Sequence, residues 1–413
     1  MNIQQVLPLL KNKKQLLLCP GPVNVAANVK LKSMQAEFGH RESEFELLFT
    51  NLQQKLFKVF EIRRIKNYTS VLITGSGSAA NEAVLSSIVG NKHILIISNG
   101  EFGERLKDIS QLHNKHTHHL RFPWSKIIDI NSVDAYLIQQ HIDVIALVHH
   151  ETSSGMLNPI EQIGKLAKKH NCILFVDAVS SAGAEKIDLE KWNVDFCSTS
   201  ASKALGSLPG LSIVLGRKQA FQDLKNIPAK TCYLDLYKYY QYSEEKRQTP
   251  NTPAIQLIVA LDQALENILQ KGVRATRQEI RLRANYIRNE LRTLGLAFLI
   301  DEKNMSSILT TVKLPSNITF KDLKVALRNK NIIVYNGKGP FQDLYFQVAN
   351  IGQITENDLS YFLSVCKYML KNKTKNAISL NLSAMKQLAS NQKLSFNHSL
   401  KVDTHKSHLS LHK

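Results

Sequence analysis

A lysine among small residues is the first candidate for chemistry in this chain. Lys203 stands in Ser200-Ala201-Ser202-Lys203-Ala204-Leu205-Gly206, just after an apolar, strand-like run. If small neutral side chains keep water from it, the pKa of its amine falls, and the amine becomes a nucleophile for carbonyl carbons. An ordinary solvated loop lysine is the alternative, and Lys203 alone does not decide between the two.

An aspartate ends a second apolar run, Leu174-Phe175-Val176-Asp177. A carboxylate at the carboxyl end of a parallel strand lies where open α/β sheets bind ligands. A surface or helix-capping aspartate would give the same local pattern, so Asp177 is also ambiguous alone.

A turn rich in glycine and serine, Gly75-Ser76-Gly77-Ser78, follows a third strand-like run and opens a helix-like segment. Glycines let the backbone approach a ligand, and a helix N-terminus offers free N–H groups and a positive dipole end. Ser76, Gly77 and Ser78 could therefore hold a phosphate. Turns of this kind are common, so the motif is weak when taken alone.

Together the three features predict a site for pyridoxal 5′-phosphate (PLP). Lys203 would form a Schiff base with the cofactor aldehyde, and the turn would hold its phosphate. Asp177 would pair with the pyridine nitrogen and keep it protonated, which makes the ring an electron sink. One strand–loop unit separates Asp177 from Lys203, so both fit a single sheet edge.

The elements that must position these residues follow from the hydrophobic pattern. Continuous apolar runs alternate with amphipathic segments, which predicts an α/β fold with a mostly parallel sheet buried on both faces. The predicted strands are 71–74, 93–98, 143–148, 172–177, 195–199 and 211–215.

The pattern changes after Pro253, where two long helical stretches precede a strand–helix–strand–helix order. We expect a smaller C-terminal α+β domain there. The predicted division is an N-terminal arm over 1–20, a large PLP-binding domain over 21–253, the small domain over 254–370 and a basic, mobile tail over 371–413.

Composition excludes several classes of protein. Hydrophobic residues make up 43% of the 413 residues, which is enough for a substantial core. No apolar run reaches the roughly 18 residues of a membrane span, and no secretory signal is evident, so we expect a cytoplasmic protein without a membrane partner. Five dispersed cysteines argue against disulfides and a zinc module.

The net charge of +19 does not by itself indicate a nucleic-acid partner. Eight lysines and one acid after residue 370 supply +7 of it, which leaves +12 elsewhere, without a basic stripe interleaved with aromatics. A positive field also suits anionic substrates and a phosphate cofactor. Four histidines, His113, His116, His118 and His119, are interpreted as a solvated loop cluster, and no metal site is predicted.

From Leu16 to Leu370 the sequence resembles the fold-type I, class V PLP aminotransferases, and is similar to 2-aminoethylphosphonate–pyruvate and alanine–glyoxylate transaminases. The motifs that carry the resemblance run from Leu16 (LLLCPGP), Phe38 (FGHRESEF), Gly75 (GSGSAANE), Asn99 (NGEFGER), His150 (HETSSGMLNPI), Val176 (VDAVSS) and Ser200 (SASK).

The resemblance implies a role for each matched residue. Phe102 would stack on the cofactor ring and Thr152 would bond near the ring hydroxyl. Ser202 would face the phosphate, although relatives often carry a longer amide or imidazole there. Thr252 would reach the phosphate of a neighbouring subunit, so a homodimer is implied.

One position departs from the family pattern. Gln347 stands where relatives carry an arginine that grips the substrate carboxylate through two hydrogen bonds. Either Arg41 takes the anion, or the substrate lacks an α-carboxylate, or the activity is altered. Arg41 and Gln347 are therefore the predicted substrate-binding residues.

The predicted activity is transfer of an amino group from a small amine or amino acid, with 2-aminoethylphosphonate as the best candidate, to a 2-oxo acid such as pyruvate. Lys203 would move the proton as general base and acid. Alternatives are an alanine or serine–glyoxylate type transaminase, a PLP lyase, and a catalytically impaired binding protein on the same fold.

Overall fold

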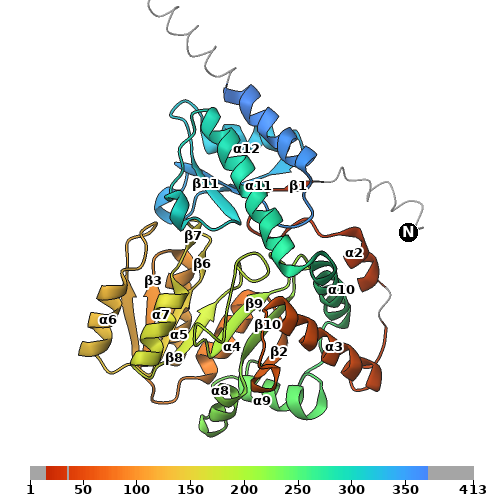
Figure 1. The fold of residues 1–413 in the computed structure, drawn as a ribbon, viewed down its shortest axis with the longest axis vertical. Helices are drawn as coiled ribbons and strands as arrows, with labels where there is room; N and C mark the ends of the chain where they lie inside the picture. Colours follow the sequence, from red (N-terminus) through yellow and green to blue (C-terminus); the bar gives the residue numbers. More distant parts are fainter. Residues whose placement is uncertain (1–14, 35–36, 371–413) are drawn as a thin grey trace, which may run out of the picture.

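A seven-stranded sheet forms the centre of the larger body in the computed structural model, which describes residues 15–34 and 37–370 (Figure 1). Only β10 runs antiparallel to its neighbours, so the sheet is mostly parallel, as predicted. Its strand order is β2 (Tyr68–Thr74), β10 (Leu211–Arg217), β9 (Phe196–Ser200), β8 (Ile173–Asp177), β5 (Val144–Val148), β3 (Ile94–Ser98) and β4 (Thr117–Arg121).

Alternate residues of each central strand enter two different cores. In β3, Leu95 and Ile97 belong to one hydrophobic cluster, whereas Ile94 and Ile96 belong to the other. Both faces are apolar because helices cover both, which explains the continuous apolar runs in the sequence. One face packs against α3 (Ser43–Val59), α6 (Ile130–Gln139), α7 (Ile160–Lys169) and α10 (Ile255–Lys271), and the other against α4 (Gly77–Ser87), α5 (Glu101–His113), α8 (Lys218–Gln222) and α9 (Leu236–Gln241).

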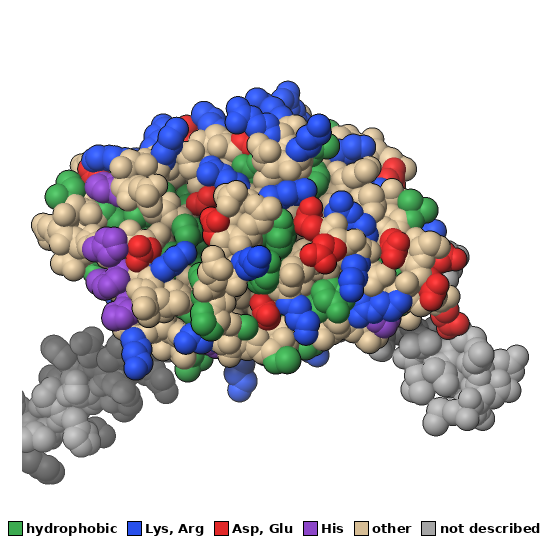
Figure 2. All heavy atoms as spheres, turned by 90° about the horizontal axis from the view of Figure 1, so that it is seen from below, with side chains coloured by type: hydrophobic (Ala, Val, Ile, Leu, Met, Phe, Trp, Pro, Cys, Tyr) green, Lys and Arg blue, Asp and Glu red, His purple; other side chains and the backbone are tan. Residues whose placement is uncertain are grey.

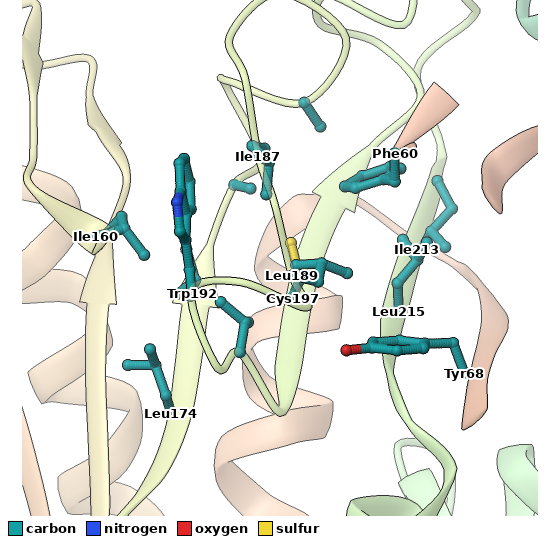
Figure 3. Packing of buried hydrophobic residues seen from close by; sticks show 14 of the residues in the cluster. Phe60, Tyr68, Ile160, Leu174, Ile187, Leu189, Trp192, Cys197, Ile213 and Leu215 are labelled. Carbon is teal, nitrogen blue, oxygen red and sulfur yellow. The ribbon is translucent and has the colours of Figure 1, made fainter. Parts of the chain in front are cut away.

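The segment between β8 and β9 completes the first of these cores. Figure 3 shows Ile187, Leu189 and Trp192 of this segment beside Cys197 of β9. All four are at most 9% exposed. The connection is therefore packed rather than a free loop, which fixes β8 and β9, the strands that precede Asp177 and Lys203.

A second, antiparallel sheet lies at the other end of the molecule, beyond the long helix α11 (Val273–Thr293) (Figure 1). It orders β11 (Leu309–Lys313), β14 (Tyr345–Ala349) and β13 (Tyr335–Asn336), and packs with α12 (Phe320–Arg328) and a helix over 356–370. Two pairs of short strands complete the fold. The N-terminal strand β1 (Leu16–Leu17) pairs with β12 (Ile332–Ile333), and β6 (His150–Glu151) forms a hairpin with β7 (Met156–Leu157) in the larger body. Helix α2 (Ala27–Ser33) packs on α10.

The predicted fold class is confirmed, and the six predicted strands all occur within a few residues of their expected bounds. The interpretation of the histidine cluster as a loop is wrong for three of its members, and only His116 lies in the connection between α5 and β4. His118 and His119 lie in β4, an edge strand whose polar sequence lacks the apolar run used to recognise strands, and His113 ends α5. The tail over 371–413 and the first 14 residues lie outside the described part of the chain.

Charge is mixed over the surface seen in Figure 2, where Lys and Arg side chains alternate with acidic ones and histidines gather at one end. In the described residues, no helix has the length and apolar character needed to cross a membrane.

Candidate active site

The carboxyl ends of four strands meet at one edge of the large sheet, and a pocket of about 260 Å³ lies there. β2 leads into the glycine–serine turn, β5 into β6, β8 ends at Asp177, and β9 is followed by Lys203. Ligands bind at this edge in open α/β folds because loops and helix N-termini converge on it. Seven of the predicted site residues line the pocket: Ser76, Gly77, Ser78, Phe102, Asp177, Ser202 and Lys203.

Lys203 is partly buried at this edge of the sheet. Its Nζ donates a hydrogen bond to the carbonyl oxygen of Pro20 at 2.8 Å. Burial lowers the pKa of Lys203, since the charged form loses its hydration, while the field of Asp177 works in the opposite direction. Burial thus favours the uncharged form of the amine, the form that attacks carbonyl carbons.

The chain segment around Pro20 approaches Lys203 closely because residue 21 is glycine. A Cβ at Gly21 would lie 2.4 Å from Lys203 Nζ, and the backbone there has φ +142°. In the sequence, the Cys-Pro-Gly-Pro motif contributes only to the resemblance to class V aminotransferases. The structure gives it a physical role, which is to place a carbonyl acceptor against the amine.

Asp177 is 4% exposed and held by two donors. Asn81 Nδ2 donates to Oδ2 at 2.7 Å, and the N–H of Val179 donates to Oδ1 at 2.8 Å. Asn81 is oriented in turn by Ser198, whose hydroxyl donates to Asn81 Oδ1. Burial raises the pKa of Asp177, and these donors oppose that rise. A positively charged partner in the pocket would stabilise the carboxylate further.

Helix α4 points its N-terminus into the pocket. Ser76 is its N-cap residue, but the Ser76 side chain makes no capping hydrogen bond, so the first N–H groups of the helix remain available to a ligand. Gly77 is required for space, because a Cβ there would lie 2.7 Å from Val179. This arrangement suits an anionic group such as a phosphate.

Phe102 lines the pocket from the first turn of α5, where Glu151 fixes it. The buried Glu151 carboxylate accepts hydrogen bonds from the N–H groups of Phe102 and Gly103, with a Gly103 distance of 3.0 Å, and from Ser153 Oγ at 2.6 Å. Burial raises the pKa of Glu151, while the helix N-terminus and Ser153 favour its charged form. Glu151 was not predicted, although it lies inside the quoted motif at His150.

The two predicted residues Thr152 and Gln347 contact each other outside the pocket lining. Gln347 Nε2 donates to the carbonyl oxygens of Thr152, at 2.8 Å, and Ser153, at 3.1 Å. Gln347 is fully buried in β14, and its Oε1 has no hydrogen-bond partner among the described residues. It ties the second sheet to the loop after β6 and offers no charge to a substrate.

Arg41 and Thr252 are also away from the pocket lining. Arg41 donates to Gln248 Oε1 at 2.9 Å and to the carbonyl oxygens of Thr249 and Pro250, at 2.7 and 3.1 Å. Its guanidinium is thus committed to the loop that carries the exposed Thr252. Within one chain the structure does not bring either residue to Lys203.

His150 is a pocket residue that sequence reasoning missed. It lines the pocket, is 1% exposed, and neither ring nitrogen has a hydrogen-bond partner among the described residues. Such buried polar atoms are costly unless something pairs with them. The only sequence signal was its place after a buried strand, at the same edge as Asp177.

Burial lowers the pKa of His150 to about 3, from 6.5. The unfolded chain binds a proton between these values that the folded chain does not, so the free energy of unfolding falls as pH falls below 6.5. As pH falls, we expect the free energy of unfolding of the cofactor-free His150→Leu variant to decrease by about 1 kcal/mol less per pH unit than that of the wild type. Urea unfolding at pH 7, 6 and 5 measures this, with the exposed His141→Leu as control. Equal slopes for wild type and His150→Leu would contradict it.

Three observations indicate that the pocket suits PLP. An uncapped helix N-terminus faces it, Lys203 is a partly buried amine of lowered pKa, and His150 brings two ring nitrogens without a hydrogen-bond partner among the described residues. Asp177 adds the carboxylate that a protonated ring nitrogen requires.

Comparison with known proteins agrees with this geometry. The model of the family "Aminotransferase class-V" matches residues 26–350. An uncharacterized aminotransferase of Methanocaldococcus jannaschii is 32% identical over 87% of this chain and 93% of its own length. The 2-aminoethylphosphonate–pyruvate transaminase of Phocaeicola vulgatus is 30% identical over 86% of this chain and 99% of its own.

A solved structure is similar over nearly the same extent. The alanine–glyoxylate aminotransferase of Nostoc sp. superposes with a TM-score of 0.82 at 27% identity, and covers 88% of this chain and 96% of its own. The residues matched by the family model, 26–350, include both sheets and the pocket. The chain therefore belongs to the class V aminotransferases and is a PLP-dependent transaminase.

Proposed function

We propose that this enzyme transfers the amino group of a small anionic amine, with 2-aminoethylphosphonate as the leading candidate, to a 2-oxo acid such as pyruvate. The observation that carries the transfer is the convergence of Lys203, Asp177 and the α4 N-terminus on one pocket. The donor rests on relatives that match along nearly their whole length and are named 2-aminoethylphosphonate–pyruvate transaminases.

Bound PLP supplies an electron sink that makes the substrate C–H acidic. The α4 N-terminus and the hydroxyls of Ser76 and Ser78 would hold its phosphate. Asp177, fixed by Asn81, would keep the ring nitrogen protonated. Phe102 would cover the ring.

Lys203 would hold the cofactor covalently, and its amine, when free, would take the proton from the substrate carbon as general base and return it as general acid. The Pro20 carbonyl at 2.8 Å orients its Nζ when the amine is free.

A donor screen tests the proposed substrate. PLP-loaded protein is first incubated with single amines alone, and pyridoxamine phosphate and carbonyl products are quantified. Pyruvate or glyoxylate is then added as acceptor, and turnover is measured. We expect 2-aminoethylphosphonate to give the highest kcat/KM. A preference for alanine or serine with glyoxylate would favour the alanine–glyoxylate type, while carbonyl product without pyridoxamine phosphate would indicate a lyase.

We also propose that the enzyme is a cytoplasmic homodimer. Within each chain, we propose that the large domain ends at residue 253 and the small domain begins at residue 254. The cluster of Arg41 and Thr252 supports the dimer, because it lies at the surface away from its own pocket and is ordered by backbone contacts. It would then serve the second copy's site, where Thr252 would reach the phosphate and Arg41 would hold the loop that carries Thr252. Solution mass by light scattering checks the dimer.

A further inference from the structure

The pocket needs a cation for the anionic end of its substrates, and position 347 does not supply one. Gln347 is uncharged, fully buried and donates its amide hydrogens to backbone carbonyls. A 2-oxo acid carries a carboxylate, and an aminophosphonate carries a phosphonate. Such groups are bound in proteins through charge-assisted hydrogen bonds from arginine or lysine.

Two cations share one carboxylate oxygen, and one of the two lines the pocket. Arg105 lines the pocket from α5, and its Nη2 lies 3.1 Å from Glu101 Oε1. Lys338 comes from the loop between β13 and β14, and its Nζ lies 3.5 Å from the same oxygen. The second sheet thus places a lysine beside the helix that carries Phe102.

Both cations are held in position before any ligand binds. The Arg105 guanidinium lies over the Phe102 ring at 4.7 Å. The Lys338 loop rests on the larger body, because Gly339 approaches Trp124 so closely that a Cβ would lie 2.5 Å from its ring. Phe341 of the same loop packs beside Trp124, with ring centroids 6.2 Å apart.

The cluster carries a spare positive charge that an anion can use. Two cations face one carboxylate, and the side chains of Arg105, Lys338 and Glu101 are 43%, 44% and 29% exposed. Ion pairs this exposed contribute little stability, so a ligand can replace Glu101 at small cost. Burial is the main cause of the lowered pKa of Lys203, and the charges of Arg105 and Lys338 add to it, so their field reaches the reacting amine.

We propose that Arg105 and Lys338 form the subsite for the anionic end of the substrate, a carboxylate or phosphonate, and that Glu101 holds both side chains until the ligand replaces it. This inference rests on the proposed transamination. Relatives carry a carboxylate-binding arginine at position 347. In this chain two cations, one from α5 and one from the β13–β14 loop, would take its role.

Binding of simple anions tests the subsite without turnover. PLP-loaded wild type, Lys338→Gln and Lys338→Arg are titrated with methylphosphonate and with pyruvate by calorimetry. We expect Lys338→Gln to weaken both about tenfold or more, Lys338→Arg to bind within about threefold of wild type, and Glu101→Gln to bind more tightly. The exposed Lys330→Gln serves as the matched control and should bind like wild type.

Two outcomes overturn the subsite: unchanged affinities in Lys338→Gln and in Arg105→Gln, or an equal loss in Lys330→Gln. Retained absorbance of the PLP–lysine band in each variant shows that the cofactor site is intact. The proposal that 2-aminoethylphosphonate is the amino donor is tested separately from the subsite. If 2-aminoethylphosphonate is not turned over while anion binding still depends on Lys338, the subsite stands. If its KM is the same in wild type and Lys338→Gln, the subsite is wrong and the donor stands.

Discussion

Lys203→Ala is expected to lower kcat by about 10³-fold or more, because it removes both the covalent attachment of the cofactor and the group that moves the substrate proton. The purified variant should also lack the visible band of the PLP–lysine link, while keeping some cofactor through the α4 N-terminus and Asp177. Steady-state kinetics and an absorption spectrum measure the two effects independently.

The matched control is Lys191→Ala, which changes an exposed lysine paired with Glu161 on the surface. It should keep both the band and the rate. Turnover by Lys203→Ala near the wild-type rate would show that the partly buried amine next to Pro20 is not the reacting group.

Asp177→Asn is expected to lower kcat by about 10² to 10³-fold, the loss typical when one pre-positioned electrostatic partner is removed from a water-excluded site. An amide at 177 can still accept a hydrogen bond from Val179, but it cannot keep a ring nitrogen protonated. The cofactor should remain bound with an altered absorption spectrum, so the loss should appear in kcat more than in KM.

Asp195→Asn is the control for Asp177→Asn, since Asp195 is also a largely buried carboxylate on the same sheet and accepts the N–H of Leu174 at 2.9 Å. Burial raises the pKa of Asp195 as it does that of Asp177. We expect Asp195→Asn to reduce stability but leave kcat within about twofold, in line with a structural role. Similar losses of kcat in both variants would mean that Asp177 acts only through folding.

The cofactor end of the site was predictable because its residues follow strand ends. Parallel strands carry their carboxyl ends to one edge, so the turn at Ser76, the end of β8 and the end of β9 had to meet. The continuous apolar runs in the sequence predicted where the central strands lie. The polar strand β4 escaped prediction because an edge strand needs no apolar run.

The remaining parts of the site depend on contacts between distant segments, which periodicity does not show. Pro20 reaches Lys203 across 183 positions, and Lys338 reaches Glu101 across 237. His150 and Glu151 lie inside a quoted motif, but their roles follow from burial and from the N-terminus of α5. The sequence marks Gln347 as a departure from the family pattern, yet the hydrogen bonds from Gln347 to the loop at Thr152 appear only in three dimensions.

The most direct test of the account is to find the lysine that carries the cofactor. PLP-loaded protein is reduced with borohydride, digested and mapped by mass spectrometry, with unreduced protein as control. The account predicts a phosphopyridoxyl group on the peptide that contains Lys203 and its absence from Lys203→Ala. A group attached to a different lysine, or no adduct on protein shown to hold PLP, would contradict it.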